Sequence, residues 1–158
     1  MEAVALRDQW PERDTAWAMS EENVEIVRRV FDQFLLGLQR GDPAAFFDSE
    51  AVDDAYEWVT VDAELDGNSV WQGREGFLEF LGTWTQEFSE WSISVERWID
   101  AGNDRVIALT RQSAVGKASG VPVELPIGQV YELEEGRLVR VRNYRGHAEA
   151  LEAAGLSE

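Results

Sequence analysis

The sequence predicts an α+β fold in which helices precede a strongly curved antiparallel sheet. Two periodicities indicate it: apolar residues recur at three- and four-residue steps within residues 20–88, and at two-residue steps within residues 91–144. The expected strands exceed the usual length of about 5–6 residues, so they must twist and curve. Helices packed across the concave side of such a sheet would enclose a pocket.

Three helices are expected before the sheet. The first begins at Ser20, a good N-cap, and keeps one apolar face until Gly41 ends it. A short second helix has Pro43 at its first position, and a third covers about residues 74–88.

Four hairpin-linked strands and a closing helix are expected in the second half. Pro122 and Pro126 interrupt the third strand and indicate bulges or edge pairing there. Gly155 is expected to end the closing helix in the left-handed conformation. Turn residues at 101–104, 119–120 and 135–136 divide the strands, which cover about residues 93–100, 105–117, 121–134 and 138–144.

Composition excludes several classes of function. Lys+Arg 14 against Asp+Glu 31 leaves a formal charge of −17, which disfavours nucleic acids and anionic membranes as partners. The chain has no cysteine, which removes disulfides, thiol nucleophiles and Cys-ligated zinc, and its one histidine, His147, cannot build a multi-histidine metal site. We therefore expect no metal and no cofactor.

A single domain is expected over residues 20–158, after an N-terminal extension of residues 1–19 that lacks a sustained period. The alternative for the extension is a short helix whose tryptophans, Trp10 and Trp17, dock on the domain or on a partner. No segment approaches the roughly 18 apolar residues of a membrane span, and no secretory signal is visible at the start. A cytoplasmic location is therefore expected.

Several motifs, taken together in this order, resemble the SnoaL-like branch of the NTF2-like (nuclear transport factor 2-like) superfamily. They cover residues 20–29, 40–42, 71–76, 99–106, 135–139 and 149–156. The resemblance implies a cone, in which the curved sheet wraps over the helices and encloses an apolar pocket, and a homodimer formed through the outer face of the sheet. The superfamily includes isomerases, cyclases, dehydratases, epoxide hydrolases and proteins that only bind, so the fold does not decide the function.

The epoxide-hydrolase branch offers an informative comparison. Arg111 and Tyr56 match residues of its active site, whereas Ser113, Asn143 and Trp58 stand where that branch has two carboxylates and an asparagine. Serine and asparagine cannot take a proton from water near neutral pH. Epoxide hydrolysis is therefore not expected.

The leading hypothesis is that the pocket binds a small hydrophobic molecule. An inward Arg111 would need a carboxylate, with Glu57 and Glu124 as possible partners, or an anionic ligand; the alternative is a surface salt bridge. Core packing is the alternative for Trp58, Trp84 and Trp98. The expected binding residues are Tyr56, Trp58, Trp84, Trp98, Arg111, Ser113, Gln129, Tyr131 and Asn143.

Two further hypotheses remain open. The acidic segment 53–66 is expected to be a solvated loop over the mouth of the cone, and Gly73 at the twelfth position of its EF-hand-like stretch argues against calcium. If Asp54 or Glu57 were desolvated, its raised pKa would suit a general base, as in an isomerase, cyclase or dehydratase of the ketosteroid-isomerase or polyketide-cyclase type. The third hypothesis is a protein-interaction or scaffold module. His147 is expected to be exposed or to cap the closing helix.

Overall fold

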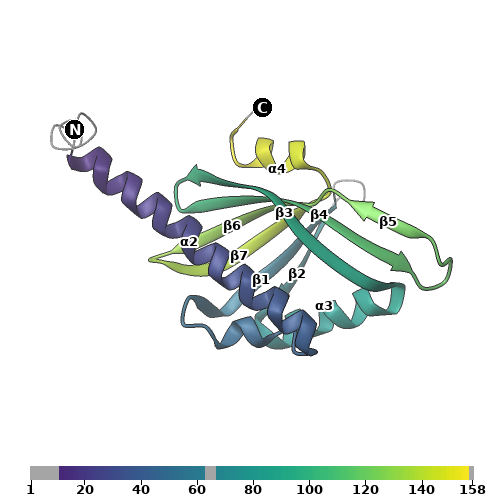
Figure 1. Ribbon diagram of the computed structural model, residues 1–158. Helices are drawn as coiled ribbons and strands as arrows, with labels where there is room; N and C mark the ends of the chain where they lie inside the picture. The colour runs from purple at the N-terminus through teal and green to yellow at the C-terminus, as the bar shows by residue number, and fades with distance from the viewer. Residues whose placement is uncertain (1–10, 63–66, 157–158) are drawn as a thin grey trace.

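The computed structural model of the chain describes residues 11–62 and 67–156, with side chains for residues 21–61 and 69–156 (Figure 1). Its elements are the helix α2 (Pro11–Arg40), the 3-10 helix η1 (Ala45–Asp48), β1 (Val52–Asp62), β2 (Gly67–Gln72), α3 (Gly73–Glu87), β3 (Phe88–Gly102), β4 (Arg105–Gly116), β5 (Pro122–Leu125), β6 (Gly128–Glu134), β7 (Arg137–Tyr144) and α4 (His147–Ala153).

The strands form one curved sheet in the order β2-β1-β7-β6-β4-β3, and β5 pairs with the far end of β4. Every neighbouring pair is antiparallel except β1 and β7, which run parallel with Trp58 opposite Val141. The predicted α+β class is confirmed, but the sheet is mixed, and the expectation of a purely antiparallel sheet is wrong. Three register shifts along β3 accompany the curvature, as bulges do.

Helices lie on both faces of the sheet (Figure 1). α2, η1 and α3 pack on one face, which we call the inner face, and α4 packs on the opposite, outer face. Although α2 has 30 residues, no helix in the described part of the chain is long and apolar enough to cross a membrane.

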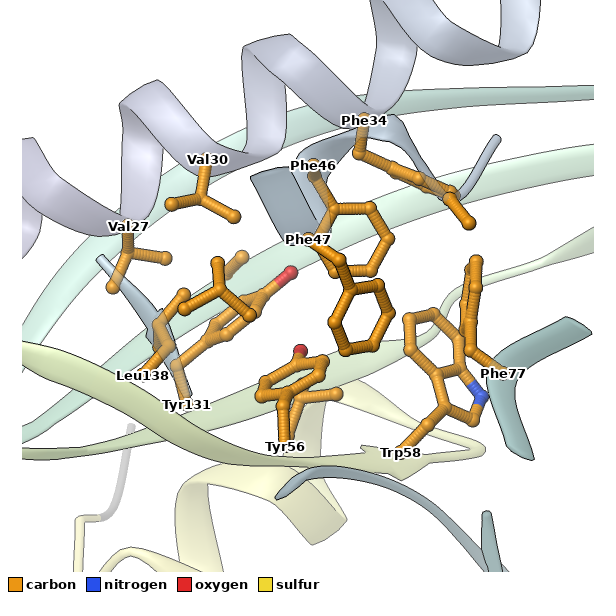
Figure 2. Close-up of a cluster of buried hydrophobic side chains, with 14 of the residues drawn as sticks. Val27, Val30, Phe34, Phe46, Phe47, Tyr56, Trp58, Phe77, Tyr131 and Leu138 are labelled. Atoms are coloured by element: carbon orange, nitrogen blue, oxygen red, sulfur yellow. The ribbon is translucent and has the colours of Figure 1, made fainter. Parts of the chain in front are cut away.

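The main core lies between the inner face and the helices, and it is rich in aromatic rings (Figure 2). Phe34 of α2 contacts the rings of five other residues, at centroid distances of 5.7–6.3 Å. Phe77 of α3 is fully buried against Phe46 and Trp58, each 5.1 Å away. Edge-to-face contacts of this kind add to the hydrophobic stabilisation of the buried rings.

A smaller core joins α4 to the outer face. Ile107 and Leu109 of β4 and Val130 of β6 pack there against Ala150 and Leu151 of α4. The approach is close at Gly128, because a Cβ atom added to it would clash with the Cβ of Ala150. A glycine is therefore required for α4 to dock on β6.

The residues predicted to end two helices and to form two hairpin turns do so in the structure. Gly41 and Gly155 adopt positive φ angles of 79° and 80° and end α2 and α4. The hairpin turns at 103–104 and 135–136 also have positive φ at both central residues, as a tight turn between twisted strands requires. The third expected strand is divided at Pro126 into β5 and β6, and Pro122 is the first residue of β5, which pairs only with β4.

Two expectations for the first half of the domain are wrong. α2 does not begin at Ser20: it begins at Pro11, where proline suits the first helical position. Residues 52–62 are not a loop, since they form β1, which lies between β2 and β7 within the sheet. Residues 1–10 of the expected extension, and Glu64 and Asp66 of the acidic segment, lie outside the described residues.

Candidate functional site

A cavity of about 860 Å³ opens at the end of the sheet where α3 meets β3. Each wall comes from a different element: the β1–β2 hairpin, α3, the start of β3, and the ends of β4, β5 and β7. The described lining residues are Trp58, Thr60, Val61, Ser69, Trp71, Phe80, Thr83, Trp84, Gln86, Glu87, Phe88, Trp91, Gln112, Leu125, Ile127, Asn143 and Arg145.

Six aromatic residues form one continuous wall of this cavity. Phe80, Trp84 and Phe88 follow one another at four-residue steps, so the first two share a face of α3 and the third begins β3. Neighbouring rings are in contact: Trp58 lies 5.1 Å from Phe80, and Trp84 lies 5.0 Å from Trp91. Trp71 of β2 completes the wall, 6.1 Å from Phe80.

A backbone irregularity in β3 brings two of these rings to the same wall. The register against β4 shifts between Ser89 and Ser92, and Glu90 adopts a φ of +55° there. Because side chains alternate along a regular strand, Phe88 and Trp91, three residues apart, would face opposite sides without the shift. The left-handed Glu90 is thus part of how β3 presents Trp91 to the cavity.

Two neutral amide side chains of the sheet, Gln112 and Asn143, contribute polar groups to the lining. Gln112 is 5% exposed, accepts a hydrogen bond at its Oε1 from the indole N–H of Trp91 at 3.0 Å, and donates to the hydroxyl of Thr110 at 3.2 Å. Asn143 accepts from the amide of buried Gln129 at 2.8 Å and donates to the carbonyl of Val59 at 3.0 Å.

Three indole N–H groups of the wall lack a partner. The Nε1 atoms of Trp58, Trp71 and Trp84 are sealed from solvent, and no acceptor in the described part of the chain lies within hydrogen-bonding distance of them. A buried donor left unpaired costs about 1–3 kcal/mol, and most buried polar groups in proteins are paired. The wall therefore holds donors that the protein itself does not satisfy.

Two buried tyrosines lie behind the cavity. Burial, and for Tyr56 also the proximity of Tyr131, raises the pKa of both phenols above the ordinary value. Both phenols therefore stay protonated near neutral pH, and the hydroxyl of Tyr131 donates to Gln129 at 2.7 Å. Tyr131 thereby supports Gln129, and neither phenol serves as a base near neutral pH.

The carboxylates considered for catalysis lie elsewhere. Asp54 is exposed, and Glu57 faces outward from β1, where it accepts a 2.7 Å hydrogen bond from Arg140. Among the described lining residues Glu87 is the one carboxylate, and it is exposed. The described part of the cavity therefore contains no desolvated carboxylate suited to a general base.

Arg111 and Ser113 face outward, so the expectation of an inward Arg111 is wrong. Arg111 is 49% exposed on its side chain and pairs with Glu96 at 2.9 Å and with Glu124 at 3.1 Å, which is the surface salt-bridge alternative. The hydroxyl of Ser113 is hydrogen-bonded to the hydroxyl of Ser92 in the neighbouring strand, with the two oxygens 2.6 Å apart.

The remaining expected residues divide between cavity and core. Trp58, Trp84 and Asn143 line the cavity. Tyr56, Gln129 and Tyr131 are buried beside it, whereas Trp98 packs against Phe31 of α2 at 5.5 Å. The core-packing alternative therefore holds for Trp98, and Tyr56, expected to bind the ligand, also packs in the core.

His147 opens α4 and has a structural contact. Its Nε2 lies 2.8 Å from the carbonyl oxygen of Thr110, and its side chain is 23% exposed. The ring therefore ties α4 to β4, in place of the expected exposed or capping role.

Sequence reasoning missed most of the lining. Gln112 lies on a strand for which Arg111 and Ser113 were expected to face the pocket, and Trp91 stands before the strand expected at 93–100. Thr60 lies in the segment 53–66 that was expected as a loop, and Trp71 was not assigned to a helix or a strand. For α3 a signal was available, since Phe80 stands four residues before Trp84.

The comparisons with known proteins agree on the fold. The model of the SnoaL-like domain matches residues 27–141, and no curated protein matches the chain. An NTF2-like protein of unknown function from Burkholderia pseudomallei superposes with a TM-score of 0.62 at 16% identity, over 83% of this chain and 95% of that chain.

Two further solved structures are similar. A candidate SnoaL-like polyketide cyclase from a Jannaschia species has a TM-score of 0.62 at 22% identity, over 78% of this chain and 84% of its own. TerC, co-crystallised with polyporic acid, has a TM-score of 0.62 at 15% identity, over 85% of this chain and 98% of its own. At such identities the likeness establishes the fold and not an activity. Because the family model spans most of its length, the chain belongs to the SnoaL-like domain family.

Proposed function

We propose that the protein binds a small, flat, hydrophobic molecule in the cavity beside α3. The observation that carries this proposal is the wall of six aromatic side chains around a cavity of about 860 Å³. Ligand pockets commonly have volumes of roughly 300–1,000 Å³ and apolar, aromatic linings with a few polar groups. The TerC structure supports the proposal, since a chain of similar fold was crystallised with polyporic acid.

Binding is favoured over isomerase, cyclase or dehydratase chemistry. Such chemistry needs a carboxyl group or another base within hydrogen-bonding distance of the ligand. Apart from the exposed Glu87 and Arg145, the polar residues of the described lining are neutral amides and hydroxyls, which bind and orient without taking up protons.

No observation favours the interaction-module alternative. That reading predicts a large apolar patch on the surface. In the described part of the chain the exposed large hydrophobic residues are Leu36, Val70, Leu78 and Val121, one each from α2, β2, α3 and the loop before β5.

A fluorescent probe tests the proposal directly. The dye 1-anilinonaphthalene-8-sulfonate should bind with enhanced emission, and Thr83→Trp, on the cavity side of α3, should abolish this binding by filling the cavity. Leu78→Trp is the matched control, because Leu78 is on the same helix, is 46% exposed, and is not among the lining residues. Equal binding by both variants would contradict the proposal.

We also propose a homodimer formed through the outer face of the sheet. Support comes from the family resemblance and from charges of both signs on β6 and β7, where Glu132 lies between Arg140 and Arg142. A face with both signs of charge can complement a second copy of itself in an isologous contact. Light scattering at low protein concentration tests this, and a strictly monomeric mass would refute it.

A further inference from the structure

The register of the sheet places three polar side chains of the cavity in one row. Ser69 of β2 lies opposite Thr60 of β1, and Thr60 lies opposite Asn143 of β7. All three line the cavity, so their side chains share the inner face of the sheet. The row continues at Gln129 of β6, which lies opposite Asn143 and donates a hydrogen bond to it at 2.8 Å. We call Ser69, Thr60 and Asn143 the polar row.

An aromatic row runs beside the polar row. Side chains two residues apart share a face of a strand. Trp58 stands two residues before Thr60, Trp71 stands two residues after Ser69, and the two tryptophans lie opposite each other. Phe80 of α3 packs on both indoles, 5.1 Å from Trp58 and 6.1 Å from Trp71. The inner face of the sheet therefore presents a polar stripe and an aromatic stripe to the cavity, about 7 Å apart along the strands.

The polar row offers both donors and acceptors. The hydroxyls of Thr60 and Ser69 make no hydrogen bond within the described part of the chain, so each can donate and accept. Asn143 donates to the carbonyl of Val59 and accepts from Gln129, which leaves it a second N–H and a second lone pair on its oxygen. The polar row can therefore bind hydroxyl and carbonyl substituents alike.

The aromatic row offers a ligand no hydrogen bond. The indole nitrogens of Trp58 and Trp71 are sealed from solvent, so a molecule in the cavity does not reach them. A polar substituent placed against these rings would lose its bonds to water and gain none. An apolar edge placed over the polar row would likewise remove water from the two hydroxyls and from Asn143 without replacing it. The two rows thus require opposite chemistry from one molecule.

We propose that the cavity selects a flat aromatic molecule whose oxygen substituents lie on one edge, and that this edge follows the polar row while the rings pack beside Trp58 and Phe80. The inference rests on the proposed function and adds the class of ligand. Neighbouring strands are about 4.8 Å apart, so the three side chains of the polar row span about 10 Å. A row of that length meets two substituents of one edge at once, whereas substituents on opposite edges reach it one at a time.

The competing class is a molecule with polar groups on two opposite edges, which would join the polar row to the polar residues of α3. Those residues are Thr83, Gln86 and Glu87, and all three are exposed. The hydroxyl of Thr83 already donates to the carbonyl of Phe80 at 2.7 Å. In the polar row, two of the three side chains are half-buried, and hydrogen bonds are stronger where water is excluded. The sheet therefore favours a ligand that is polar along one edge.

Two isomers of one molecule test the inference. 2,7-Dihydroxynaphthalene carries both hydroxyls on one long edge, and 2,6-dihydroxynaphthalene carries them on opposite edges, whereas their ring system and number of hydroxyls are the same. Each is measured by displacement of the bound dye, with naphthalene as the unsubstituted reference. In the wild-type protein we expect the 2,7 isomer to bind about three- to tenfold more tightly than the 2,6 isomer, as one additional hydrogen bond allows.

Substitutions of similar size locate the preference. Thr60→Val and Ser69→Ala each remove a hydroxyl from the polar row and should bring the affinities of the two isomers together. The ratio of affinities cancels any general loss of binding. Thr85→Val is the matched control on α3, because Thr85 is exposed, donates to the carbonyl of Gly82 and is not among the lining residues. Ser113→Ala is the control on the outer face. Both controls should keep the wild-type ratio, and a wild-type ratio in both variants of the polar row would overturn the inference.

The wild-type measurement alone can overturn the inference, whether or not the variants fold. Equal affinity for the two isomers, or tighter binding of the 2,6 isomer, refutes the one-edge arrangement while the binding function stands. Displacement of the dye by naphthalene alone has the same meaning. If neither isomer nor naphthalene displaces the dye, the proposed binding of flat hydrophobic molecules fails, and the inference fails with it.

Discussion

The two faces of β4 differ in chemistry although they alternate along one strand. The inner face carries Thr110 and Gln112, which are buried, neutral and bonded to each other. The outer face carries Leu109 beneath α4 and then Arg111, which reaches solvent and pairs with two carboxylates. A single residue step thus separates a polar neutral lining from a charged surface.

The cost of burial explains this difference. An amide or hydroxyl can be buried when its hydrogen bonds are made, whereas a buried ion loses far more hydration than one partner returns. Throughout the outer face, ions lie where water or another ion reaches them, as in the group formed by Glu57, Arg140, Glu132 and Arg142. The formal charge of −17 is therefore compatible with a cavity whose amide wall is neutral.

The largest loss of unfolding free energy is expected from a substitution in the core on the inner face. Phe77→Ala removes a fully buried ring that packs against Phe46 and Trp58 behind the cavity. We expect a loss of about 3–5 kcal/mol of unfolding free energy, measured by urea denaturation. Leu78→Ala, at the next and exposed position, should change it by less than about 0.5 kcal/mol. Similar losses for both would contradict the assignment of the core.

A smaller effect is expected where α4 covers the outer face. Gly128→Ala forces a new Cβ atom against Ala150 and should cost about 1–3 kcal/mol of unfolding free energy. Gly82→Ala, in open space on α3, should instead stabilise the protein by about 0.5–1 kcal/mol. Adding Ala150→Gly to Gly128→Ala should restore part of the loss; without any recovery the clash is not the cause.

The smallest effect concerns the ions of the outer face. Burial alone would raise the pKa of Glu132, but hydrogen bonds and charges from Arg142 and Arg140 outweigh it and hold that pKa below its usual value. A lowered folded-state pKa means that this stabilisation is present above the unfolded value of about 4.3 and is lost as the pH falls through the folded value. Glu132→Gln should cost about 1 kcal/mol at pH 7.

Unfolding free energies of the wild type and Glu132→Gln, measured across acidic and neutral pH, check this prediction. The difference between them should shrink as the pH drops below about 4.3, because the wild-type carboxyl then becomes protonated. A difference that stays constant with pH would show that the lost stability does not come from the charge of Glu132.

Part of the candidate site could be predicted from the sequence, but which face of each strand points toward the cavity could not. Arg111 and Ser113 were expected in the pocket because they match positions of the epoxide-hydrolase active site, but they share the outer face of β4 with Leu109. The structure shows that α4 buries Leu109 from the outer side. An apolar residue in a strand indicates that the position is buried, but it does not indicate which face of the sheet it lies on.

The strand β1 shows the same limit. Its acidic residues Asp53 and Glu57 suggested a solvated loop, yet they face outward toward Arg137 and Arg140, while Tyr56 and Trp58 of the same strand face the core. The pairing partners come from β7, more than eighty residues later in the chain. No local sequence pattern identifies a partner that lies so far away in the chain.

By itself the sequence determined the α+β class, the C-terminal ends of α2 and α4 and two hairpin turns, because helix caps and tight turns depend on the few residues that form them. Gly41, Gly155 and the 103–104 and 135–136 turns adopt left-handed backbone angles that those residues tolerate locally. The tertiary structure decided the parallel pairing of β1 with β7, the inward face of each strand, and therefore which amides and indoles meet at the cavity. Those choices depend on what packs against each face, and in this chain the packing partners are distant in sequence.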